Sequence, residues 1–284
     1  MTEQIGAALR LLYPDGRAIT PDSATDDFSL KSLCEDNVYS LTLTPRRAGL
    51  ALAAVEYDIP LPPDLTDVPE ELYIYDDSAY TNDFTSVVPY VGNEARTVYN
   101  LAVFKNLRTR KVFLCGLLTA HRFLAMFNLH DGLVTLRFDL EERELHAGEA
   151  YLLERFMVAE GTDNENVLLE AYGDAVAACN GARPDKPLPV GWCSWSCYYG
   201  NVNEEKIRRA ADGQATYTRA GESNLIQIDD GWQRCGSFCG KWVPDDTKFP
   251  SGLEATGQYV RDRGMTFGGW RRGFWMTNRI ITGN

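Results

Sequence analysis

Two adjacent carboxylates are the residues of this sequence best able to do chemistry. Asp229 and Asp230 follow the largely apolar run 224–228, and Gly231 comes directly after them. Neighbouring carboxylates can each accept hydrogen bonds from vicinal hydroxyl groups. An Asp-Asp-Gly sequence is also typical of a solvated turn or a helix cap, so the pair alone does not define a site.

The tryptophans strengthen the interpretation of the carboxylates. All six lie after residue 190: Trp192, Trp195, Trp232, Trp242, Trp270 and Trp275. An indole face suits the C–H face of a pyranose ring, and the indole N–H can donate a hydrogen bond. Carboxylates and indoles at one edge would therefore indicate a carbohydrate ligand.

Alternating strands and helices are predicted to position these residues. The expected elements are strands at 189–195, 224–229 and 265–270 and helices at 203–220 and 251–263. Asn203 should cap the first helix, Ser251 and Glu254 should form a capping box on the second, and Gly264 should end it. This alternation predicts parallel strands, whose carboxyl ends share one edge where ligands bind. We therefore expect Asp229, Asp230, Trp195 and Trp270 at that edge.

The N-terminal part has a different character. Short alternating or apolar runs up to about residue 160 predict an antiparallel β-sandwich, and 166–179 predicts a helix. The segments 21–36 and 58–83 are expected to be long surface loops. The tyrosines among the acids of the second loop, Tyr73, Tyr75 and Tyr80, are interpreted as loop packing or, alternatively, as a sugar-stacking platform. The division expected is a sandwich with a connecting helix at 1–181, a Pro-rich linker at 182–188 and a second domain at 189–284.

Composition excludes several classes of protein. The net charge of -12 over 284 residues argues against nucleic-acid binding. The most apolar stretch, 112–127, contains His121 and Arg122, so no membrane-spanning helix is expected. The N-terminus does not resemble a secretory signal, and seven dispersed cysteines predict free thiols and a cytoplasmic location.

No metal or cofactor is expected, although one alternative stays open. Cys193 and Cys197, and likewise Cys235 and Cys239, have a spacing that structural zinc permits. Isolated thiols are the preferred interpretation. The three histidines, His121, His130 and His146, are scattered through the N-terminal part and are expected in packing or surface roles.

Four ordered segments resemble the melibiase-type α-galactosidases, which are retaining glycoside hydrolases. They are 191–195 (Gly-Trp-Cys-Ser-Trp) with Tyr198-Tyr199, 226–233 (Ile-Gln-Ile-Asp-Asp-Gly-Trp-Gln), 248–253 (Lys-Phe-Pro-Ser-Gly-Leu) and 259–268. Raffinose synthase-like proteins carry similar motifs and remain a close alternative. The resemblance implies that 189–284 is the N-terminal part of a (β/α)₈ barrel, about three strand–helix units long, behind the family's β-sandwich.

The resemblance also implies roles for individual residues. Asp229 and Asp230 would hold hydroxyls of an α-galactoside, chiefly those at carbons 4 and 6. Trp195 and Trp270 would line the sugar pocket, Trp242 could reach its rim, and Trp232 would pack beneath the loop. The full-length form of such a protein could be a homo-oligomer.

The catalytic pair of that family has no counterpart here. Its nucleophile and its acid/base are Asp residues after strands four and six, whereas this sequence has no Asp or Glu after Trp270. Retaining hydrolysis needs two carboxyl groups, one on each side of the bond that is cleaved. Asp229 and Asp230 do not meet that need, because they are neighbours on one strand end. We therefore expect a truncated α-galactosidase-like chain that is inactive alone, with residues 271–284 a divergent tail. The alternatives are a noncatalytic galactoside-binding or interaction protein and a raffinose synthase-like fragment.

Overall fold

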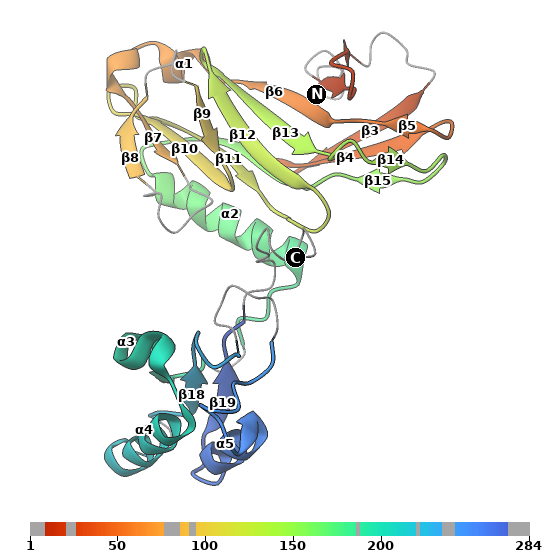
Figure 1. Ribbon diagram of the computed structural model, residues 1–284. Coiled ribbons are helices and arrows are strands. Elements are labelled where there is room, and N and C mark those ends of the chain that lie inside the picture. Colours follow the sequence, from red (N-terminus) through yellow and green to blue (C-terminus); the bar gives the residue numbers. More distant parts are fainter. Residues whose placement is uncertain are drawn as a thin grey trace. The chain divides into compact units, whose positions relative to one another are not determined.

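The computed structural model describes residues 9–20, 27–76, 86–90, 95–185, 188–219, 222–234 and 242–271. The chain divides into two compact units, Met1–Pro184 and Asp185–Asn284 (Figure 1). The point of division lies inside the segment 182–188 that the sequence predicts as a linker. Each unit is described by itself below.

The first unit consists mainly of two antiparallel sheets. One runs in the order β2 (Ala18–Ile19), β1 (Leu9–Leu12), β6 (Ala54–Pro60), β13 (Leu133–Asp139), β12 (Leu124–His130) and β9 (Arg96–Val98). The other runs β15 (Tyr151–Leu152), β4 (Val38–Pro45), β16 (Phe156–Thr162), β11 (Lys111–Leu117), β10 (Leu101–Asn106), β7 (Leu72–Asp76) and β8 (Ser86–Pro89), with β3 (Phe28–Glu35) paired to β4. A small ribbon joins β5 (Leu50–Ala51) to β14 (Glu144–Leu145).

An apolar core lies between the two sheets. Phe138 of β13 and Phe156 of β16 are fully buried, and their ring centroids lie 6.3 Å apart. Tyr57 of β6 contacts the same Phe156 ring at 5.7 Å. Strands with one apolar and one polar face bury the apolar face against a second sheet, so the antiparallel architecture predicted for this part is confirmed.

Two segments predicted as loops contain regular structure. Residues 28–35 of the first form β3, which pairs with β4 along its whole length. The second holds the short helices α1 (Pro63–Thr66) and η2 (Pro69–Glu71) and then β7. The loop prediction was wrong there because it relied on Asp and Pro, which are typical of turns, whereas strand pairing depends on neighbours distant in sequence. Tyr73 and Tyr75 therefore lie on a strand, and Tyr80 lies outside the described residues.

The helix predicted from the periodicity of 166–179 is α2 (Glu165–Asn180), and the structure places it over the outer face of the second sheet (Figure 1). Leu168 is buried there against Val112, Leu114 and Met157. The Tyr172 hydroxyl donates to the carbonyl of Leu117 at 2.7 Å, and its ring lies where a Cβ on the neighbouring Gly116 would be. The helix is therefore fixed by apolar burial together with one specific polar contact.

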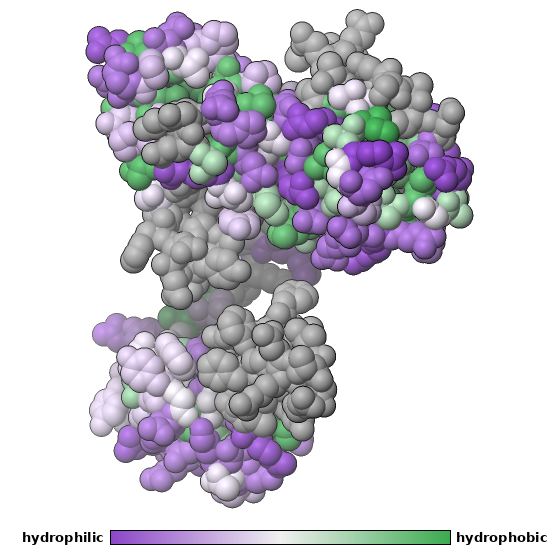
Figure 2. All heavy atoms as spheres, turned by 45° about the horizontal axis from the view of Figure 1, so that its top comes forward, coloured by the Kyte–Doolittle hydropathy of each residue, from purple (hydrophilic) through white to green (hydrophobic). Residues whose placement is uncertain are grey.

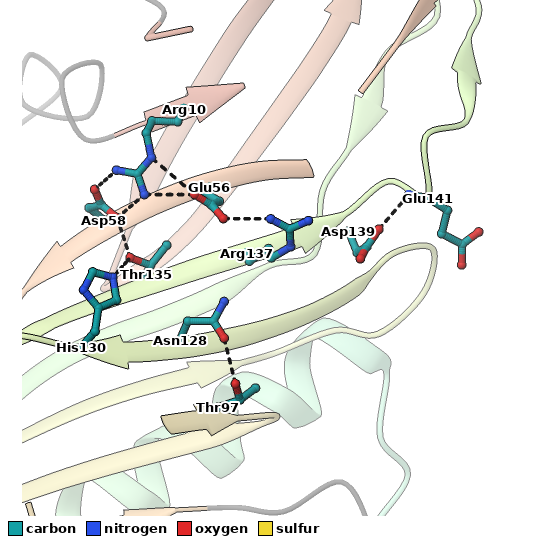
Figure 3. A network of polar contacts seen from close by, with 10 residues as sticks. All are labelled: Arg10, Glu56, Asp58, Thr97, Asn128, His130, Thr135, Arg137, Asp139 and Glu141. Carbon is teal, nitrogen blue, oxygen red and sulfur yellow. Dashed lines mark hydrogen bonds and ion pairs between the residues drawn. The ribbon is translucent and has the colours of Figure 1, made fainter. Parts of the chain in front are cut away.

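The first sheet carries charged and polar side chains on its other face, which Figure 3 shows. Arg10 of β1 pairs with Glu56 and Asp58 of β6, and Glu56 also accepts a bond from Arg137 of β13. The hydroxyl of Thr135 donates to Asp58 at 2.7 Å. These cross-strand pairs hold the registry of three neighbouring strands. Figure 2 shows hydrophilic residues over much of the described surface, with smaller hydrophobic areas between them.

In the described residues of the second unit, three parallel strands lie in the order β17 (Gly191–Cys193), β18 (Leu225–Ile228) and β19 (Thr266–Gly269). Between them come α3 (Trp195–Tyr198), η3 (Tyr199–Asn201), α4 (Glu204–Tyr217) and α5 (Gly252–Arg261). Ile226 and Ile228 of β18 are buried with Ile207 of α4 and Val260 of α5. The predicted helices and the second and third predicted strands are present with slightly shorter bounds, whereas the strand predicted at 189–195 is limited to 191–193 and Trp195 begins helix α3.

The helix ends show one confirmed and one incorrect prediction. Asn203 caps α4, with its side chain accepting the backbone N–H of Lys206 at 2.9 Å. The capping box of Ser251 and Glu254 does not form, because the Ser251 side chain makes no capping bond. The backbone N–H of Ser251 instead donates to the carboxylate of Glu204 at 3.0 Å. This contact between two helices is not visible in the local sequence.

Candidate functional site

The carboxyl ends of β17 and β18 bring the two aspartates into one hydrogen-bonded cluster. Register pairs Cys193 with Gln227, so the residues that follow each strand lie side by side. Ser194 is fully buried, and its hydroxyl accepts the backbone N–H of Asp229 at 2.8 Å. This bond fixes the start of the loop after β18 against the end of β17.

Asp229 is bonded from several directions. The Cys193 thiol donates to Oδ2 of Asp229 at 3.2 Å, and the Gln227 side-chain amide lies 3.5 Å from the same oxygen. The other oxygen, Oδ1, accepts the backbone N–H of Asp230 at 2.7 Å. Burial of Cys193, together with the Asp229 carboxylate, raises the pKa of its thiol. The thiol therefore keeps its proton at neutral pH and can donate it.

Asp230 has a separate support. The side-chain amide of Gln233 donates to Oδ1 of Asp230 at 2.6 Å. Gln233 is 2% exposed, and its Oε1 accepts the backbone N–H of Gly231 at 3.2 Å. Asp230 itself is half-buried. The four residues 230–233 thus form a closed turn in which the carboxylate has a fixed direction.

The turn is held against the loop after β17 by a close backbone approach. Gly231 has a φ of 102°, and a Cβ there would lie 2.5 Å from Cα of Gly200. The Lys248 ammonium donates to the carbonyls of Gly200 and Gly231, at 2.8 and 2.7 Å. Lys248 therefore clamps the two loops together, and only glycine fits at position 231.

The predicted aromatic residues separate into two groups. Trp232 is buried, as expected, and its ring lies 6.0 Å from that of Trp242, which lies 6.2 Å from that of Trp270. The Trp232 indole N–H also donates to the carbonyl of Trp270 at 3.1 Å. Trp195 is 41% exposed and packs edge-on against Tyr199 at 5.2 Å, outside that three-indole cluster.

Arg271, the residue after Trp270, contacts the indole cluster. It is exposed, with its guanidinium 5.3 Å from the centre of the Trp242 ring. A cation over an indole face is favourable. The rest of the expected divergent tail, 272–284, lies outside the described residues.

Sequence reasoning found the two carboxylates and the indoles but missed their supports. Ser194, Gln227, Gln233 and Lys248 were part of the quoted motifs without a role assigned to them. Gln227 and Gln233 lie within three residues of the aspartate that each contacts, whereas Ser194 and Lys248 act from segments distant in sequence. Among the described residues, no group of three or more His, Cys, Asp or Glu could hold a metal ion. Cys235 and Cys239, half of the zinc alternative, lie outside them.

Comparisons with known proteins find partial sequence matches to one group of enzymes. No protein-family model matches the chain. An alpha-galactosidase of Cyamopsis tetragonoloba is 34% identical over 82 residues, which are 28% of this chain and 20% of that protein. Alpha-galactosidase A of Cellvibrio japonicus is 36% identical over 84 residues, 29% of this chain and 21% of that protein. These matches thus span about a fifth of each relative's length.

Solved structures share the fold over a longer stretch. The GH36 alpha-galactosidase AgaA of Geobacillus stearothermophilus superimposes with a TM-score of 0.62 at 16% identity, over 93% of this chain and 45% of that chain. The alpha-galactosidase of Lactobacillus brevis gives a TM-score of 0.58 at 15% identity, over 93% of this chain and 44% of that one. The chain therefore spans less than half the length of these structures. With the sequence matches, the shared fold shows that this chain is related to the alpha-galactosidases.

Proposed function

We propose that this chain provides the galactoside-holding side of an α-galactosidase-type glycoside hydrolase site. The observation that carries the proposal is the pair Asp229 and Asp230, held by hydrogen bonds at the carboxyl end of β18 next to the end of β17, in the loop that continues into Trp232 of the indole cluster. In this proposal the three parallel strands correspond to the first three units of a (β/α)₈ barrel. The antiparallel unit corresponds to the β-sandwich in front of it.

The ligand chemistry follows from the groups available. Carboxylate oxygens accept hydrogen bonds from sugar hydroxyls, and such charge-assisted bonds are about twice as strong as neutral ones. Asp229 and Asp230 would accept the hydroxyls at carbons 4 and 6 of a terminal α-galactosyl unit. Trp195, Trp242 and Trp270 would supply apolar surface around its ring. A relative of this chain, AgaA, has been solved in complex with raffinose, which supports an α-galactoside as the ligand.

The same proposal assigns no hydrolysis to the 284 residues alone. Retaining hydrolysis needs one carboxylate that attacks and another that protonates the leaving oxygen. Both oxygens of Asp229 already accept bonds from the protein, and Asp230 is its immediate neighbour on the same strand end. No carboxylate follows Trp270 in the sequence. The reaction therefore depends on carboxylates that these residues do not supply.

The test uses the purified 284-residue protein, produced in a host without its own α-galactosidase. We expect no turnover of a chromogenic α-galactoside, and weak galactose binding in saturation-transfer NMR. Asp230→Asn should weaken that binding about tenfold to a hundredfold, because one charge-assisted hydrogen bond is lost. Asp246→Asn is the matched control, since Asp246 is exposed and pairs only with Arg234 among the described residues.

Two results would overturn the proposal. Turnover of the chromogenic α-galactoside at about one per second, abolished by Asp229→Asn or Asp230→Asn, would place the catalytic carboxylates within this chain. Galactose binding that Asp230→Asn leaves unchanged would remove the carboxylate pair from the site. Glucose, which differs from galactose in the orientation of its 4-hydroxyl, serves as the control sugar.

Within the described ranges, no helix combines the length and the apolar character that crossing a bilayer requires. The cytoplasmic location and the homo-oligomer of the full-length form remain predictions from the sequence.

A further inference from the structure

The two aspartates of the site are held by different side chains, and they differ in how many of their carboxylate oxygens already accept a hydrogen bond. Asp229 receives the Cys193 thiol on Oδ2 and a backbone N–H on Oδ1. Asp230 receives the Gln233 amide on Oδ1. Within the part of the chain that the structure describes, Oδ2 of Asp230 has no hydrogen-bond partner.

The direction of the Gln233 amide is determined by its surroundings. Its oxygen faces the backbone N–H of Gly231, so its NH₂ group must face Asp230. A reversed amide would place its oxygen against a carboxylate and its NH₂ against an N–H donor. Because the side chain is almost fully buried, water cannot readily replace either bond. Gln233 therefore fixes Oδ1 of Asp230 and leaves Oδ2 directed elsewhere.

Cys193 has the corresponding role for Asp229. Its sulfur accepts the backbone N–H of Trp195 and lies 3.7 Å from the Gln227 amide, and its S–H donates to Oδ2 of Asp229. The thiol is thus held from two sides while it holds the carboxylate. A thiol is a weak donor, so Asp229 keeps acceptor capacity on Oδ2 for a further bond.

We propose that Cys193 and Gln233 are positioning residues, that each orients one carboxylate, and that Oδ2 of Asp230 is the open acceptor on which ligand binding depends most. The ligand in this statement, a galactoside, rests on the proposed function above. The positioning itself does not, since it concerns contacts within the protein.

The first test examines positioning in the full 284-residue chain without any sugar. The carboxyl carbons of aspartate are labelled with ¹³C, and the resonances of the pair are assigned from the spectra of Asp229→Asn and Asp230→Asn. The methionine side chain in Gln233→Met is similar in volume to glutamine but has no hydrogen-bond donor, so this variant should move mainly the Asp230 resonance. Cys193→Ala should move mainly the Asp229 resonance, and Cys193→Ser, which keeps a donor, should restore it. Spectra in which neither Gln233→Met nor Cys193→Ala moves its own partner would refute the positioning roles.

The second test measures galactose affinity in the same variants. Gln233→Met should weaken binding about tenfold, since a carboxylate free to rotate is less often in the binding direction. The galactose affinity of Cys193→Ser should lie within about twofold of that of the unsubstituted chain. Cys193→Ala should lose less galactose affinity than Gln233→Met does. Tryptophan fluorescence spectra identify any variant that has unfolded.

The outcomes separate the two proposals. No galactose binding by the unsubstituted chain, with the expected ¹³C shifts, contradicts the proposed function and supports positioning. Galactose binding that Cys193→Ala reduces more than Gln233→Met contradicts the unequal roles and leaves the proposed function intact. Should Gln233→Met fail to fold, Gln233→Asn, which shortens the side chain by one methylene but keeps the amide, provides the same comparison.

Discussion

Gly231→Ala provides a direct test of how the site is assembled. Gly231 has a φ of 102°, and a Cβ added there would meet Cα and the carbonyl oxygen of Gly200 at 2.5 and 2.6 Å. Both contacts are with backbone, so no rotamer change can relieve them. The two loops would have to separate, which would lengthen the bonds from Lys248 to their carbonyls.

The expected magnitude combines strain and overpacking. A left-handed backbone conformation costs a non-glycine residue about 1–2 kcal/mol, and an added methyl group in a tightly packed place costs about 1–3 kcal/mol. We therefore expect Gly231→Ala to lower the free energy of unfolding of the second unit by about 2–5 kcal/mol. Gly200→Ala is the matched control, because a Cβ at Gly200 has nothing within 4 Å and that residue has no left-handed φ.

Tryptophan fluorescence makes the measurement specific to the second unit. All six tryptophans lie after residue 190, so excitation at an indole-selective wavelength during urea unfolding does not report on the first unit. Far-UV circular dichroism reports on both units, so a transition that it detects and fluorescence does not belongs to the first unit, and that transition should be unchanged. A free energy of unfolding for Gly231→Ala within about 0.5 kcal/mol of that for Gly200→Ala would refute the close approach of the two loops.

Three further predictions concern other contacts. Lys248→Met should lower the free energy of unfolding of the second unit by about 1–3 kcal/mol, because two carbonyls lose their donor; fluorescence-detected urea unfolding checks it, and no change would contradict the clamp. Burial raises the pKa of Glu154, but bonds from Thr119 and the backbone of residues 121–123 outweigh it and hold that pKa below the ordinary 4.5. The resulting stabilisation is present above about pH 4.5 and is lost as the pH falls through the folded-state value, so Glu154→Gln should flatten the acid dependence of first-unit unfolding measured by circular dichroism, and an unchanged slope would contradict this. Residues 181–185 are exposed, so an Asp-specific endoproteinase should cut first between Pro184 and Asp185; early cuts within 49–59, with this segment protected, would contradict the domain division.

Local signals in the sequence predicted much of the fold. Alternating and apolar runs predicted the antiparallel unit, the periodicity of 166–179 predicted α2, and Asn203 marked the start of α4. These features depend on residues a few positions apart, whose preferences act in nearly any context. The loops predicted at 28–35 and 72–76 failed for the opposite reason. Those segments are strands because β4 and β10 lie beside them.

The site divides in the same way. The residue types at 229–230 were enough to nominate two carboxylates, because side-chain chemistry and strand ends can be recognised locally, and the family resemblance implied that Trp232 packs beneath the loop. Only the tertiary structure decided how the carboxylates are held. The Gln233 side chain bonds to both Asp230 and Gly231, and the Cys193 thiol on the neighbouring strand bonds to Asp229. The Lys248 ammonium donates to two loop carbonyls that are 48 and 17 residues away from it in sequence. Hydrogen bonds between strands depend on register and rotamer, and these are set by packing of the whole unit rather than by any short segment of the chain.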